Sequence, residues 1–193
     1  MGRIMKKCII MGNGPSIADM PQELLWKMDS FGVNYCPYLP IYYVCVDRDI
    51  LINHHEDIYN IAALVEIAYL AEKENGTSDL YELPNVQLVT HDKAAFAAER
   101  FFSGFTVVYV ALKMAYYLGY EEVHLWGVDH SQDWSHYKDD YPRGDVAGRK
   151  ARMAEMEYHY KLAANVYKAA GRRIINHSHQ SSLDMIFDRQ KGE

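Results

Sequence analysis

The chain has 193 residues, of which 49% are hydrophobic and 24% are charged, a composition typical of one well-packed globular domain. Its formal net charge of −6 disfavours a protein that coats nucleic acid, because such a protein needs a basic face. Its three cysteines lie far apart in apolar stretches, and no apolar run is long enough to span a membrane. We therefore expect one domain over residues 1–193, with reduced thiols, in the cytoplasm.

Strand and helix patterns alternate along the chain. Apolar segments predict strands over residues 7–11, 31–35, 41–46, 86–90, 123–129 and 172–176. Helical spacing predicts helices over residues 20–28, most of 50–74, 104–119, 149–170 and 181–187, although IAALVEIAYLA inside the second of these could instead hold a strand. This alternation predicts an α/β fold: a single Rossmann-like domain with a mostly parallel sheet and helices on both faces.

Polar residues follow the predicted strands at the point where each strand ends. In a parallel sheet these positions share one edge, and ligands bind there. The segments concerned are Gly12–Ser16, Asn34-Tyr35, Asp47-Arg48-Asp49, Thr90-His91, Asp129-His130 and Asn176-His177. We therefore expect the functional site at this carboxyl edge of the sheet.

The first of these segments, GNGPS, is rich in turn-forming residues. It lacks the third glycine of the dinucleotide fingerprint and the GK[ST] of a P-loop. Its length suits one or two phosphates bound by the backbone amides of Gly12, Asn13 and Gly14, with Ser16 adding a hydroxyl. The alternative is a tight turn with no ligand.

A second predicted anion-binding point opens the long apolar helix. Ser103 and Gly104 stand at its start, where a serine cap and free backbone amides favour negative charge. Helix capping alone is the alternative. Two such points on one sheet edge fit a nucleotide diphosphate or a nucleotide sugar.

Aspartates at the same edge suggest a metal site. Asp47 and Asp49 form a D-x-D pair after one strand, and Asp129 ends another. Carboxylates in this arrangement can hold Mg²⁺ or Mn²⁺ on a diphosphate. Capping of the following helix explains Asp49 equally well.

Histidines in the polar segment after residue 129 are candidates for a general base. His130 and His136 stand near carboxylates and near Tyr137, and an imidazole in such surroundings titrates close to neutral pH. The alternative is that each is an ordinary polar loop residue.

Together these segments resemble the bacterial sialyltransferases of glycosyltransferase family 42. The resemblance depends on GNGPS, on SGFTVVYVALKMAYYLGYEEVHLWGVD and on RRIINHSHQSSLDMIF, in that order. The same segments are similar to the related DUF115 proteins, which include archaeal 6-hydroxymethylpterin diphosphokinases and short phage proteins. The resemblance implies a Rossmann-like transferase that binds a nucleotide or nucleotide-sugar donor.

The resemblance also assigns roles to individual positions. Residues of the glycine loop, after the second and third strands, and at the helix start contact the donor, which implies the same for Asn13, Gly14, Asn34, Asp47, Ser103 and Gly104. After the G-x-D motif, tyrosines assist the leaving phosphate and a histidine deprotonates the acceptor. Tyr137, Tyr141 and His136 are the corresponding candidates here.

Three functions are compatible with this pattern. The first, which we favour, is an inverting glycosyltransferase with a histidine base and a small-molecule or glycan acceptor. The second is a diphosphokinase that uses Asp47, Asp49 and Asp129 to hold Mg²⁺ on ATP. The sialyltransferases work without a metal, so these aspartates are closer to the second function. The third is a nucleotide-binding module without turnover, and each of the three permits a homo-oligomer.

Overall fold

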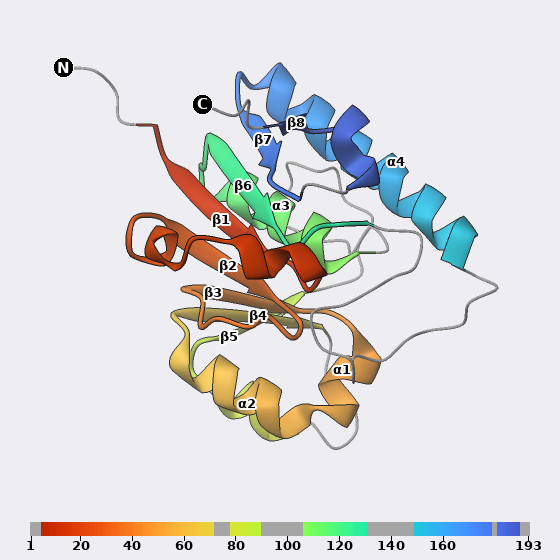
Figure 1. Ribbon diagram of the computed structural model, residues 1–193. Helices are drawn as coiled ribbons and strands as arrows, with labels where there is room; N and C mark the ends of the chain where they lie inside the picture. The colour runs from red at the N-terminus through yellow and green to blue at the C-terminus, as the bar shows by residue number, and fades with distance from the viewer. Residues whose placement is uncertain (1–4, 72–77, 90–105, 131–148, 179–180, 190–193) are drawn as a thin grey trace.

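The computed structural model describes residues 5–71, 78–89, 106–130, 149–178 and 181–189, and in them eight strands form one sheet (Figure 1). The strands follow the order β5-β4-β3-β2-β1-β6-β7-β8, and each neighbouring pair is parallel. Their bounds are β1 Lys7–Met11, β2 Asp29–Val33, β3 Tyr42–Cys45, β4 Ile67–Ala71, β5 Val86–Val89, β6 Glu122–Trp126, β7 Arg173–Asn176 and β8 Asp188–Arg189. The predicted α/β fold with a parallel sheet is confirmed.

The strand order reverses direction between β1 and β6. The chain builds the sheet outward from β1 to β5, and then returns so that β6 pairs with the other side of β1. Crossovers on either side of such a switch point leave a crevice at the carboxyl ends of the two strands. The first strand is therefore central in the sheet, and the segment that follows it lies at the switch point.

Helices cover both faces of the sheet, as predicted. The α-helices are α1 Arg48–Asn53, α2 His55–Leu64, α3 Val107–Tyr117 and α4 Arg149–Ala169, and the 3₁₀ helices are η1 Pro15–Asp19, η2 Gln22–Trp26, η3 Ser78–Glu82 and η4 Ser182–Met185. Side chains of α3 and α4 pack with Cys8 and Ile10 of β1 in one apolar cluster. Side chains of η1, α1 and α2 pack with Ile9 and Met11 in the other. This alternation along β1 is what a strand buried on both faces requires.

Some predicted segments differ from the structure. The apolar stretch 61–71 contains the strand that the sequence left open as an alternative to helix, because α2 ends at Leu64 and β4 begins at Ile67. A short run buried on both sides has no period that separates strand from helix. Residues 22–26, inside the helix predicted over residues 20–28, form the 3₁₀ helix η2 with Pro21 at its N-cap. The strand β2 starts at Asp29 and leaves no room for an α-helix of ordinary length.

The long apolar helix also begins later than predicted. Its first residue is Val107 and Thr106 holds the N-cap position, whereas Ser103 and Gly104 lie outside the described residues. It ends as predicted before Gly119, whose φ of +85° is the left-handed conformation common after helices. Among the described helices, none is both long enough and apolar enough to cross a membrane.

Candidate functional site

The backbones that leave β1 and β6 touch each other at the carboxyl edge of the sheet. The Gly12 N–H donates to the Trp126 carbonyl at 2.7 Å, and the Gly14 N–H donates to the Gly127 carbonyl at 2.8 Å. A Cβ atom at Gly12 would collide with the Gly127 carbonyl oxygen. The glycines of GNGPS are therefore needed first for this close approach between two chain segments.

Gly127 meets the same constraint from the β6 side. It has a φ of +68°, and a Cβ there would lie 2.8 Å from the Gly12 carbonyl oxygen and 2.9 Å from the Ile17 Cβ. In the sequence, Gly127 stood out only as the glycine of the G-x-D motif, with no predicted contact. Its signal was present, because a glycine between a buried strand and a polar segment often marks a close backbone approach.

The loop after β1 is hydrogen-bonded to the side-chain carboxylate of Asp129. The Ser16 N–H donates to Asp129 Oδ2 at 3.1 Å, and the Ser16 hydroxyl donates to Ser178 Oγ at 2.8 Å. Asp129 is buried, and its carboxylate packs against Gly14. The sequence predicted that the Gly14 N–H and the Ser16 hydroxyl contact a phosphate. In the structure both groups donate hydrogen bonds to the protein itself.

Asn13 and Asn34 come together at this edge, as predicted. Asn13 Nδ2 donates to the Val33 carbonyl at 3.1 Å, one residue before Asn34. Asn34 is buried with a φ of +47°, a conformation that asparagine tolerates better than most residues. Its carbonyl accepts a hydrogen bond from the Tyr43 hydroxyl at 2.7 Å. The Asn13 side chain and the Asn34 backbone are thus fixed beside the switch point.

Asn13 also carries an acceptor that the described protein leaves unsatisfied. Its Oδ1 atom is buried and has no hydrogen-bond partner among the described residues. A buried polar atom without a partner costs about 1–3 kcal/mol, so such an atom at a site is a candidate ligand contact. A ligand hydroxyl or amino group would satisfy it.

The three aspartates predicted to bind Mg²⁺ or Mn²⁺ do not form one group. Asp47 caps α1, since its Oδ1 accepts from the backbone N–H groups of Asp49 at 3.1 Å and Ile50 at 3.5 Å. Burial raises the pKa of Asp47, and these hydrogen bonds oppose the shift. Asp129 follows β6 and contacts Ser16, and β1 and β2 lie between β6 and β3 in the sheet. Within the described ranges no cluster of three or more His, Cys, Asp or Glu residues could hold a metal ion.

His130 lies at the end of the β6 segment and packs against α4. Its Nε2 is 3.6 Å from Glu157 Oε1, and its ring meets Tyr160 edge to face at 5.8 Å. The imidazole is only 5% exposed, and burial lowers its pKa although Glu157 opposes the shift. It is therefore mainly neutral at pH 7, as a general base must be. The other predicted residues of this segment, His136, Tyr137 and Tyr141, lie outside the described residues.

Residues after β7 complete the described edge. Ser178 Oγ accepts from the Val128 N–H at 3.2 Å, and the Ser181 hydroxyl donates to the Val128 carbonyl at 3.1 Å. The rule that ligands bind after parallel strands pointed to Asn176 and His177, but not to these serines. Through these hydrogen bonds the two serines connect the segment after β7 to Val128, between Gly127 and Asp129.

Comparisons with known proteins give a fold similarity. No protein-family model matches the chain, and no curated protein matches it. Among solved structures, the sialyltransferase CstII from Campylobacter jejuni in complex with the substrate analogue CMP-3FNeuAc is similar, with a TM-score of 0.60 and 18% identity over 97% of this chain and 87% of that one. The α-2,3-sialyltransferase Cst-I of the same organism gives 0.59 and 18% over 97% and 81%.

A third structure shows which ligands such an enzyme can hold together. CstII in complex with a trisaccharide acceptor and CMP has a TM-score of 0.60 and 18% identity, over 96% of this chain and 86% of that one. At this level of identity the comparisons show that the chain has a fold of the sialyltransferase type. This agrees with the fold implied by the sequence resemblance.

Substitution of Gly127 tests whether the contact between the β1 and β6 segments holds the site together. Gly127→Ala should lower the free energy of unfolding by about 2–4 kcal/mol, because it adds both backbone strain and a steric clash. Gly119→Ala is the matched control, since Gly119 also has a positive φ but no atom within 4 Å of its Cβ position. It should cost only about 1–2 kcal/mol of strain. Equal losses in urea denaturation would contradict the importance of the contact.

Proposed function

We propose that the protein is an inverting glycosyltransferase of the sialyltransferase type, which uses a nucleotide-sugar donor and a small-molecule or glycan acceptor. The observation that supports this most is the hydrogen bond from the Asn13 side chain to the Val33 carbonyl, which holds Asn13 close to Asn34 at the carboxyl edge, next to the β1–β6 switch point. Nucleotides bind at such points in parallel α/β sheets. The similar fold of enzymes crystallised with CMP and a CMP-sugar analogue supports the same class of donor.

The donor nucleotide would lie over the loop after β1. The unsatisfied Oδ1 of Asn13 would accept a hydrogen bond from it, and Asn34 would lie on the neighbouring side. Gly12, Gly14 and Ser16 would then act mainly by shaping the loop, because their described hydrogen bonds go to the protein. Asp47 at the start of α1 and the Ser103-Gly104 pair remain proposed contacts to the nucleotide and its phosphate.

The transfer itself requires a proton acceptor and stabilisation of the leaving group. The acceptor hydroxyl attacks the anomeric carbon, the bond from that carbon to the phosphate oxygen breaks, and a histidine takes the hydroxyl proton. His130 and His136 are the candidates that the sequence supplied. The tyrosines at 137 and 141 would donate hydrogen bonds to the departing phosphate.

The chemistry of the aspartates favours transfer without a metal over the diphosphokinase alternative. Binding of Mg²⁺ by Asp47 would compete with its cap on α1, and binding by Asp129 would compete with its contact to Ser16. Each carboxylate already accepts a hydrogen bond from a backbone N–H group. The two carboxylates also follow strands, β3 and β6, that are separated by β1 and β2 in the sheet.

Nucleotide binding is testable by thermal unfolding. CMP at 100 times its Kd should raise the free energy of unfolding by about 2.7 kcal/mol, and Asn13→Ala should reduce this gain. Asn85→Ala is the control, because Asn85 also donates from its amide to backbone carbonyls, of Ala62 and Val65, but lies outside the carboxyl edge. It should lower stability without changing the CMP effect. Stabilisation by ATP with Mg²⁺ and not by CMP or UDP would support a diphosphokinase instead.

Turnover is testable with a panel of CMP- and UDP-sugars. We expect release of the nucleotide to persist in EDTA, because the proposed transfer needs no metal ion. Loss of activity in EDTA that Mg²⁺ restores would contradict this part of the proposal. A protein that binds CMP but consumes no donor with any acceptor would be a binding module.

A further inference from the structure

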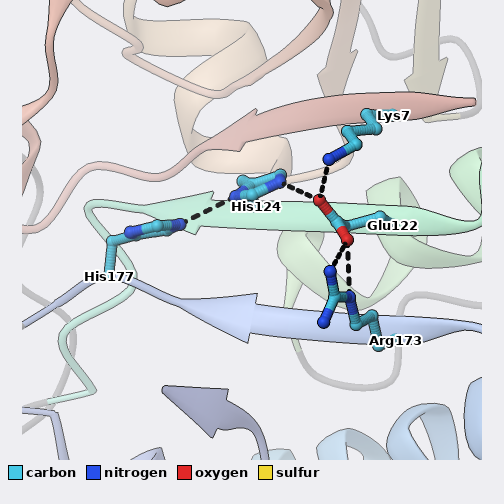
Figure 2. Close-up of polar contacts among 5 residues, drawn as sticks. All are labelled: Lys7, Glu122, His124, Arg173 and His177. Carbon is cyan, nitrogen blue, oxygen red and sulfur yellow. Dashed lines mark hydrogen bonds and ion pairs between the residues drawn. The ribbon is translucent and has the colours of Figure 1, made fainter. Parts of the chain in front are cut away.

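A buried carboxylate and two imidazoles form a hydrogen-bonded row between β6 and the end of β7 (Figure 2). Glu122 Oε1 lies 2.8 Å from His124 Nε2, and His124 Nδ1 lies 2.8 Å from His177 Nε2. The Glu122 side chain is only 2% exposed. A buried carboxylate hydrogen-bonded to an imidazole is a recurring device for orienting that ring.

The row runs toward the candidate site. Glu122 and His124 alternate along β6 with Val123 and Leu125, which pack in the cluster with α3 and α4, so the row lies on the opposite face. It starts at the first residue of β6 and reaches His177, directly after β7. His177 therefore lies at the carboxyl edge.

Two further contacts fix His177 beside the loop after β1. Its ring stacks on Trp126 with centroids 4.3 Å apart and planes at 5°. Trp126 pairs with Met11, the residue before Gly12, in the sheet register. The residue after His177 is Ser178, which contacts the Ser16 hydroxyl.

Cations at the far end of the row keep Glu122 ionised. Burial raises the pKa of Glu122, but hydrogen bonds from Lys7, His124 and Arg173 outweigh it and bring the pKa to about 2. Lys7 Nζ lies 2.7 Å from Oε1, and Arg173 contacts Oε2 through Nε and Nη2 (Figure 2). On the far side of β7, the nearest charged residue in the strand pairing is Asp188 of β8, which pairs with Ile175 and is exposed. Burial lowers the pKa of His124 despite Glu122, so this imidazole is mainly neutral at pH 7.

Hydrogen-bond counting then fixes the tautomer of both rings. An ionised carboxylate only accepts, so His124 carries its proton on Nε2 and its Nδ1 is an acceptor. That acceptor requires a proton on Nε2 of His177. A neutral His177 consequently has Nδ1 as its basic nitrogen.

We propose that His177 is an acid–base group of the candidate site and that His124 and Glu122 are its positioning residues. The inference rests on the proposed glycosyltransferase function and adds a third histidine to His130 and His136. The acceptor O–H bond breaks and its proton passes to His177 Nδ1, while the oxygen electron pair forms the new bond to the anomeric carbon. The sugar–phosphate bond breaks with its electron pair left on the phosphate oxygen.

The row stabilises the product of this proton transfer. Protonated His177 donates from Nε2 to His124, which donates from its own Nε2 to the Glu122 carboxylate. His130 has a weaker arrangement, because its only described carboxylate neighbour, Glu157, lies at 3.6 Å, beyond hydrogen-bond distance. The geometry therefore favours His177 over His130 as the proton acceptor.

Histidine NMR tests the row independently of activity. In protein labelled with ¹⁵N-histidine, long-range ¹H–¹⁵N spectra at neutral pH should show His124 and His177 as Nε2–H tautomers. His124→Leu should convert His177 to a mixture of tautomers, whereas Lys7→Met, which leaves both rings in place, should not. Nδ1–H on His177 in the unmodified protein, or an unchanged tautomer in His124→Leu, would overturn the inference.

Kinetics then test the acid–base role. His177→Asn should lower kcat by roughly 10²–10⁴-fold with unchanged nucleotide affinity, as for loss of a general base. His124→Leu should lower kcat less and shift the acidic limb of its pH profile at constant KM. His55→Gln is the control, since His55 also pairs with a carboxylate, that of Asp79, but does not belong to the row, and the kcat of this variant should not change.

The failure of this inference differs from the failure of the proposed function. Full kcat in His177→Asn, together with loss in His130→Asn or His136→Asn, would overturn the role of His177 while the glycosyltransferase stands. Absence of any sugar transfer by the unmodified protein would reject the function, and the acid–base role that depends on it, even if NMR confirms the row.

Discussion

The segments that leave β1 and β6 are in direct backbone contact, and the geometry of the whole carboxyl edge depends on this contact. Gly12 and Gly127 approach so closely that neither position has room for a side chain. Their hydrogen bonds bring the loop after β1 under Asp129, which accepts from the Ser16 N–H. Because β1 is central in the sheet, the same contact fixes the loop relative to Asn34 after β2 and Ser178 after β7.

Several polar groups at this edge are hydrogen-bonded to one another. Asp129 accepts a hydrogen bond from the Ser16 N–H in the loop after β1, Asp47 caps α1, and the Ser16 hydroxyl donates to Ser178. Such internal pairing gives a rigid edge, because each group would lose a partner if the segments separated. Among the described atoms that stay unsatisfied, Asn13 Oδ1 lies at the centre of the proposed nucleotide site. A preorganised edge with few remaining acceptors is suited to recognising one class of ligand.

The sequence predicted the fold, and which residues lie at the carboxyl edge of the sheet, better than it predicted the contacts of those residues. Apolar runs with polar ends located β1, β3, β6 and β7 closely, because strands buried on both faces have a strong composition signal. The same composition left β4 only as an alternative to helix, since a short apolar run after a helix has no distinguishing period. Loop glycines and asparagines were located at the edge by one topological rule, and the structure places Asn13 and Asn34 there together.

Roles that depend on strand register or side-chain direction could not be predicted from the sequence. Asp129 resembled a metal ligand in the sequence, but its carboxylate turns toward the Ser16 N–H. Glu122 and His124 are two residues apart in sequence, and their link to His177 exists only because β6 pairs with β7. No local sequence pattern predicts which strands pair with each other.

A crystal structure of the protein with CMP tests the central claim most directly. The account predicts that CMP lies at the carboxyl edge between the loop after β1 and the end of β2, with a donor group within hydrogen-bond distance of Asn13 Oδ1. It also predicts that Asp129 keeps its contact with the Ser16 N–H. CMP bound elsewhere on the protein, or a loop that opens and releases Asp129 to coordinate a metal ion on the nucleotide, would contradict the account.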